Sequence, residues 1–162
     1  MATLGNWLST LKLLAALGSG LIAGTFFAFS TFVMRALGRL PPPEGIAAMQ
    51  AINIVVLSPM FLGVFMGTAV LCAIGAVFSF FRWHEPGSGY LLAGSLLYLA
   101  GCFLVTAAFN VPRNNVLAAV VPTDPASASV WANYLSSWTF WNHVRTIGSL
   151  AAMVAFILAL RD

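Results

Sequence analysis

Four long apolar stretches limit what this chain can fold into. They cover approximately residues 8–37, 59–81, 90–110 and 138–160, and a helix needs about 20 residues to cross a bilayer core of about 30 Å. Charged residues make up only 7% of the chain, whereas a soluble domain carries about 25%. The sequence therefore predicts an all-α integral membrane protein, in which residues 1–162 form one four-helix bundle.

Prolines between these stretches predict a short interfacial helix before the second span. Pro41-Pro42-Pro43 interrupts the chain, and Ser58-Pro59 is typical of an N-cap followed by the first residue of a helix. We therefore expect a short helix over 44–56 and then the second span. A single helix kinked at Pro59 is the alternative.

The third and fourth spans carry similar signals. Pro112 predicts that the third helix ends at or before Val111. Asp124 could cap a helix that begins at Pro125. That helix would be either a short interfacial helix joined to the fourth span or the start of one long helix.

Unusual polar residues gather at one end of the predicted bundle. Four spans bring the carboxyl ends of the first and third helices to the same side as the amino ends of the second and fourth. Polar side chains in a membrane helix are costly unless they face protein or water, so this clustering predicts one pocket near one membrane face. The residues concerned include Ser30, Arg35, Gln50, Asn53, Asn110, Arg113, Asn114, Trp138, Asn142, His143 and Arg145.

This end of the bundle is predicted to be electropositive. Arg35, Arg39, Arg113 and Arg145 face only two carboxylates there, and two helix N-termini add partial positive charge. Such a pocket suits an anion, a phenolate or an enolate. The alternative is that these arginines extend to lipid phosphates or cap carbonyl groups.

Helical angles divide the polar residues around the fourth span. At about 100° per residue, Trp131, Tyr134, Trp138, Asn142 and Arg145 share one face. His143 points a quarter turn or more away from that face and therefore needs a different neighbour.

Location and partners follow from the same composition. We expect a multi-pass protein of a bacterial-type inner membrane, with both termini in the cytoplasm by a small excess of positive charge. The chain has no basic run, which argues against nucleic acid as a partner. Gly20 and Gly24 are spaced for close helix packing and could serve a homo-oligomer.

Cys72 and Cys102 both lie in apolar stretches, either as buried thiols or as a pair.

Four motifs resemble the DUF1772, or anthrone oxygenase-like, family of small four-helix membrane proteins. They are residues 23–34 (AGTFFAFSTFVM), 48–53 (AMQAIN), 110–118 (NVPRNNVLA) and 138–146 (WTFWNHVRT). The resemblance covers essentially the whole chain. It implies a relation to anthrone oxygenases, monooxygenases that convert an anthrone to an anthraquinone with O₂.

If the chain is an oxygenase, as the resemblance implies, its residues favour a route that needs no cofactor. The sequence has no metal-ligand cluster and no nucleotide fingerprint after a strand, although a haem held by His143 or a flavin stays open as an alternative. An anthrone loses an acidic proton to give an enolate that can itself reduce O₂. In this hypothesis His143 is the base, Arg145 and Asn142 assist catalysis, and the substrate contacts are Asn110, Asn114, Trp138, Trp141, Arg113, Asn53 and Ser30.

Two functions of other classes use the same features. The first is a membrane protein that binds or transports a small lipophilic or anionic ligand. The second is a structural subunit of a membrane complex, which Gly20 and Gly24 favour. The tryptophans also have a plainer interpretation, since an interfacial belt needs no ligand.

Overall fold

The computed structural model describes residues 2–161, and all of its regular elements are helices, with no strand in that range. The helical content and the four long apolar helices confirm the predicted all-α fold. The elements are α1 (Ala2–Ala28), the π-helical η1 (Phe29–Val33), α2 (Met34–Leu37), α3 (Pro42–Val55), α4 (Pro59–Phe81), α5 (Ser88–Tyr98), η2 (Leu99–Leu104), η3 (Thr106–Asn110), α6 (Val111–Ala118) and α7 (Ser127–Arg161).

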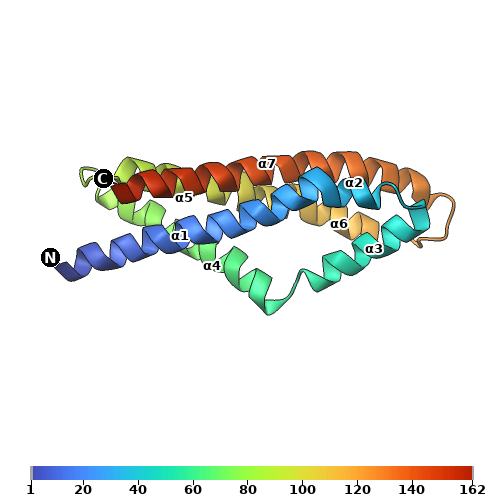
Figure 1. The fold of residues 1–162 in the computed structure, drawn as a ribbon, viewed down its shortest axis with the longest axis horizontal. Coiled ribbons are helices and arrows are strands. Elements are labelled where there is room, and N and C mark those ends of the chain that lie inside the picture. Colours follow the sequence, from blue (N-terminus) through green and yellow to red (C-terminus); the bar gives the residue numbers. More distant parts are fainter. Residues whose placement is uncertain (1, 162) are drawn as a thin grey trace.

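Four of the continuous helices are long and apolar enough to cross a membrane. They run over Asn6–Leu37, Pro59–Phe81, Ser88–Ala118 and Ser127–Arg161. Figure 1 shows both chain ends at one end of the bundle and α2, α3 and α6 at the other. This is the arrangement of a multi-pass membrane protein with an even number of spans.

Helices α3 and α4 form a V whose corner projects away from α7 (Figure 1). The predicted cap at this corner is confirmed, because the Ser58 hydroxyl accepts a hydrogen bond from the backbone N–H of Phe61 at 3.4 Å, with Pro59 as the first residue of α4. The segment before the second span is thus a separate helix, and α4 is not its kinked continuation.

The third helix does not end at Val111, so that prediction was wrong. It continues through Pro112 to Ala118, and two π-helical segments, η2 and η3, precede the proline. Proline removes one backbone donor, and wider π-turns can accommodate that loss inside a helix. The Arg113 side chain also donates a hydrogen bond of 2.7 Å to the carbonyl of Phe109.

The fourth span has no separate short helix before it. α7 is one continuous helix of 35 residues, because no breaker follows Ser127 except Gly148. Asp124 accepts a hydrogen bond from the backbone N–H of Ala126 at 2.9 Å. It therefore stabilises the turn before α7, and the helix begins two residues after the predicted Pro125.

Glycine allows the third helix to approach α7 very closely. A Cβ atom on Gly148 would lie 2.9 Å from the carbonyl carbon of Gly101 and 3.0 Å from its Cα. Both obstacles are backbone atoms, which cannot turn aside as a side chain can. Since lipid supplies no hydrophobic force between helices, this kind of close contact carries much of the packing in a membrane bundle.

Two apolar clusters fill the interior, and a polar layer separates them. One cluster surrounds Phe65, Tyr98 and Phe156 in the four-helix part. The other joins α2, α3 and α7 around Met49 and Trp138. Between them α7 carries buried polar residues over about two helical turns, namely Asn142, Arg145, Thr146 and Ser149.

We predict that Gly148→Ala destabilises the bundle by about 1–3 kcal/mol, because the added methyl group overpacks the contact with the Gly101 backbone. Gly67→Ala is the matched control, since Gly67 is an exposed residue of α4 with no atom within 4 Å of the added Cβ. Thermal unfolding of both variants in the same detergent measures the effect. Equal melting temperatures for the two variants would contradict the predicted helix contact.

Candidate functional site

Asn142 joins α7 to the first helix through hydrogen bonds to Phe26 of α1 and Ser30 of η1. Its side chain is fully buried. The Nδ2 group donates hydrogen bonds of 2.7 Å to the carbonyl of Phe26 and to Ser30 Oγ. Its Oδ1 atom remains as an acceptor, and Arg145 Nη2 donates to it.

Arg145 is a buried cation held by neutral groups. Its side chain is 5% exposed, and Nη1 donates to Thr106 Oγ1 at 3.3 Å. Its Cζ atom lies 3.9 Å from the ring centroid of Phe26 and 5.1 Å from that of Trp138, which places the charge over two aromatic faces. The Nε group is buried and has no hydrogen-bond partner.

No carboxylate balances this charge in the part of the chain that the structure describes. The one ion pair found there joins Arg82 and Glu85 in the turn at the opposite end. Burying a charge without a partner is costly in a bilayer. Hydrogen bonds and aromatic faces offset a part of this cost, and a bound anion would offset more.

Asn114 presents its amide group to the same region. Its Oδ1 atom accepts hydrogen bonds of 2.8 Å from both Tyr134 Oη and Trp138 Nε1. Two donors on the oxygen fix the orientation of the amide and leave its NH₂ group for other acceptors. Asn53 of α3 lies beside it and donates to Tyr134 Oη at 3.5 Å.

A cavity of about 220 Å³ lies between the corner of α3 and α4 and the rest of the bundle. Its lining is mainly apolar and aromatic, and its polar groups are a guanidinium, two amides and two hydroxyls. The lining residues are Thr25, Phe26, Phe29, Met49, Ile52, Asn53, Val56, Leu57, Phe61, Leu62, Phe65, Met66, Thr106, Val111, Asn114, Trp138 and Arg145.

The mouth of the cavity lies on an apolar surface. Leu57, Met66 and Val111 line the cavity and are also exposed, whereas Arg145 and Trp138 are buried at its inner end. The α3–α4 corner beside the mouth exposes further apolar side chains, including Ile54 and Met60. In a membrane this mouth would face lipid.

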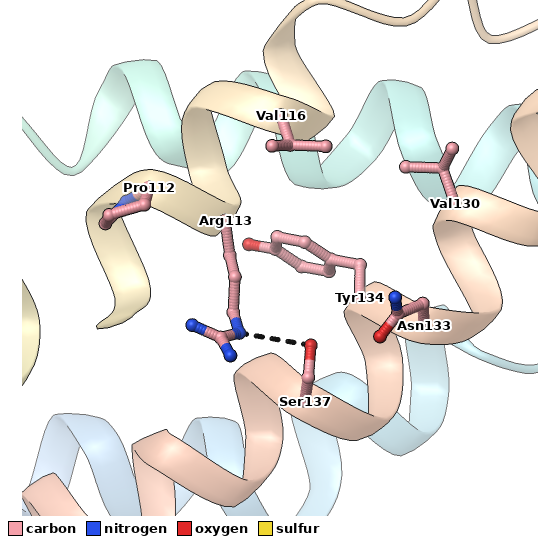
Figure 2. Close-up of a pocket in the computed structure, with 7 residues that line it drawn as sticks. All are labelled: Pro112, Arg113, Val116, Val130, Asn133, Tyr134 and Ser137. Carbon is pink, nitrogen blue, oxygen red and sulfur yellow. Dashed lines mark hydrogen bonds between the residues drawn. The ribbon is translucent and has the colours of Figure 1, made fainter. Parts of the chain in front are cut away.

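Four of the sequence-predicted site residues line this cavity: Asn53, Asn114, Trp138 and Arg145. Asn142 is not among the lining residues, and its Oδ1 atom accepts a hydrogen bond from Arg145. Arg113 is elsewhere, in a shallow hollow of about 260 Å³ between α6 and α7 (Figure 2). There it donates to Ser137 Oγ at 3.1 Å, which ties α6 to α7.

The other predicted residues lie outside the cavity. His143 is exposed and lines an outer groove with Ser30, which is also the partner of Asn142. Trp141 stacks on Phe109 with ring centroids 3.6 Å apart. Asn110 is buried and donates to the carbonyl of Trp138 at 3.2 Å, while its Oδ1 atom has no hydrogen-bond partner.

Sequence reasoning missed two polar contributors to the site. Thr106 accepts a hydrogen bond from Arg145. In the sequence, its position one turn before Asn110 on the third helix could have indicated that it belongs to the site. Tyr134 was assigned to the correct face of α7, but its hydroxyl contact with Asn114 depends on how α6 packs. The apolar lining residues carried no signal, because side chains that face a cavity and side chains that face lipid are of the same kinds.

A family model described as anthrone oxygenase matches residues 60–155, which is more than half of the chain. The chain belongs to the anthrone oxygenase family. The match confirms the resemblance found in the motifs, and it covers Thr106, Asn114, Trp138, Asn142 and Arg145 but not α3. No curated protein matched the chain in a further search, and neither did any solved structure.

We predict that Asn142→Leu lowers the free energy of unfolding by about 1–3 kcal/mol, because it removes the acceptor of a buried guanidinium and the donor to α1. Asn133→Leu is the control, since it makes the same change at an exposed position of α7. Thermal unfolding in detergent measures both variants. If the two substitutions have the same effect, Asn142 does not join the helices as described.

Proposed function

We propose that this member of the anthrone oxygenase family binds a lipophilic aromatic substrate in the α3–α4 cavity, stabilises the anion that the substrate forms when it loses a proton, and catalyses its oxygenation by O₂ without a cofactor of its own. The substrate class is an enolisable polycyclic aromatic, such as an anthrone. One observation carries the proposal. Arg145 brings an uncompensated positive charge to the inner end of an apolar, aromatic cavity.

The shape and lining of the cavity support a compact aromatic ligand. Its volume of about 220 Å³ is smaller than that of most ligand pockets, which measure about 300–1,000 Å³. A compact ligand therefore fits better than a long lipid chain. Phe26, Phe29, Phe65 and Trp138 offer ring faces and edges for stacking.

The donors are suited to an enolate. Loss of a C–H proton beside the carbonyl leaves negative charge on the carbonyl oxygen, and Arg145 with the Asn114 amide would stabilise that charge. The carbanionic carbon then transfers an electron to O₂, and the two radicals combine to form a C–O bond. Protonation gives a hydroperoxide, which loses water to give the second carbonyl of the quinone.

The substrate proton needs an acceptor in or near the cavity. None of the described lining residues is a His, Asp or Glu, and His143 opens onto the outer groove. The proposal therefore assigns the proton to a water molecule held inside the cavity by its polar groups, such as Asn53 and Asn114. Stabilisation of the enolate by Arg145 lowers the pKa of the substrate C–H bond, and this makes a weak base sufficient.

The same observation favours a second function. A cavity with a cation, apolar walls and no His, Asp or Glu among its described lining residues also suits a protein that binds or carries a lipophilic anion without changing it. Saturable quenching of tryptophan fluorescence by an anthrone, with no consumption of O₂ and no quinone product, would favour this alternative.

We expect Arg145→Met to reduce kcat by about hundredfold or more, because removing one donor to a developing oxyanion typically costs about 10²–10³. The assay follows quinone absorbance during aerobic incubation of the purified protein with anthrone, after its resting absorption spectrum has been recorded. Arg113→Met is the matched control and is expected to keep its activity, since Arg113 lies in the outer hollow. A Soret or flavin band in the resting spectrum would contradict the cofactor-free route.

We expect His143→Ala to keep activity close to that of the original chain, because this side chain does not line the cavity. The same assay measures it, with binding of anthrone followed separately by fluorescence. Loss of turnover with unchanged binding would restore His143 as the base.

A further inference from the structure

A second hollow, separate from the cavity, lies on the outer side of α1, α2 and α7. This groove has a volume of about 560 Å³ and is open to the surroundings. Ser30 and Arg35 line it from the first helix, Arg39 lines it from the turn after α2, and Ser136, Thr139 and His143 line it from α7.

The groove concentrates positive charge that nothing nearby neutralises. Arg35 and Arg39 are four residues apart and both are exposed, as is His143 across the groove. No Asp or Glu is among its described lining residues, and none of these three side chains forms an ion pair within residues 2–161. The arginines therefore have their hydrogen-bond donors free for an external anion.

A buried polar atom in the wall of the groove also lacks a hydrogen-bond partner. Thr139 Oγ1 is buried and makes no hydrogen bond, although most buried hydroxyl groups in proteins do. Its neighbour Ser136, one turn earlier on α7, donates to backbone carbonyls and keeps its lone pairs. Thr139 lines the same groove as Arg35 and Arg39, and a hydroxyl that is free to donate together with two guanidinium groups matches the several acceptor oxygens of a phosphate.

The surroundings of the groove indicate where such a phosphate comes from. On α7, Phe140 and Ile147 lie within about one turn of His143 and are exposed, and Phe32 is exposed beside Arg35. In a membrane these side chains would contact acyl chains. A phosphate bound between the arginines would then lie directly above a lipid-facing apolar surface.

We propose that this groove binds a phosphate ester, and that its occupant in the membrane is the headgroup of an anionic phospholipid. Arg35 and Arg39 contact the phosphate oxygens, and Thr139 donates a further hydrogen bond. His143 contributes to this site and not to the cavity. The site is independent of the proposed oxygenation, because Arg145 and its cavity lie on the other side of the Asn142–Ser30 hydrogen bond.

The test uses the full chain in nanodiscs of phosphatidylcholine doped with phosphatidylglycerol, and native mass spectrometry measures which lipid stays bound. We expect one phosphatidylglycerol to be retained. The double variant Arg35→Gln/Arg39→Gln should weaken this retention by at least about tenfold, because each surface cation contributes about fivefold to the binding of an anionic lipid. Thr139→Val should weaken it by a smaller factor.

The matched control is Arg82→Gln/Arg161→Gln, which removes the same charge at the opposite end of the bundle and should leave retention unchanged. Glycerol 3-phosphate is added as a soluble competitor. If it displaces the lipid, the site recognises the phosphate alone, and if it does not, the acyl chains contribute as proposed. Equal retention by the Arg35/Arg39 variant and the control variant would overturn the proposal, and so would an absence of retained phosphatidylglycerol.

Discussion

The structure depends on one hydrogen-bonded unit, the pair of Asn142 and Arg145. A guanidinium inside a membrane bundle is costly, and hydrogen-bond acceptors for its donors reduce that cost. Asn142 Oδ1 supplies an acceptor, while the Nδ2 group of the same side chain binds the first helix through Phe26 of α1 and Ser30 of η1. Helix packing and the orientation of the cation are therefore set by one amide. A change at this residue alters both together.

The π-helical segments lie at the same level as this unit. Ser30 belongs to η1, and Thr106 and Asn110 belong to η3, so three polar side chains around the α7 pair come from wide turns. A π-turn shifts the face on which the following residues lie, and such turns are frequent at functional sites. After η3 the helix passes through Pro112 and still brings Asn114 to Trp138. The irregular backbone is thus what aligns polar residues from two helices with Arg145.

Much of this arrangement could be predicted from the sequence, and the physical reasons differ from one part to another. The stripe of Trp138, Asn142 and Arg145 follows from helical angles, and the same angles separated His143 from it. The continuation of the third helix could not be predicted, because whether π-turns accommodate Pro112 depends on tertiary packing. The α3–α4 wall of the cavity could also not be predicted, since its apolar side chains resemble those that face lipid. Sequence reasoning therefore predicted the cation and a pocket at this end of the bundle, but not the residues that form the walls of that pocket.

The cavity with Arg145 and the groove with Arg35 and Arg39 differ in how much water an anion must lose in order to bind. This difference would determine which anion each of them selects. In the cavity Arg145 is buried among aromatic rings, so a ligand must lose its water to reach it. An enolate spreads its charge over fused rings and loses little hydration energy, whereas a compact phosphate would lose far more. In the open groove Arg35 and Arg39 stay exposed, and a phosphate can bind them while it keeps part of its water. Differences in burial alone would thus direct a lipophilic anion to the interior and a phosphate to the surface.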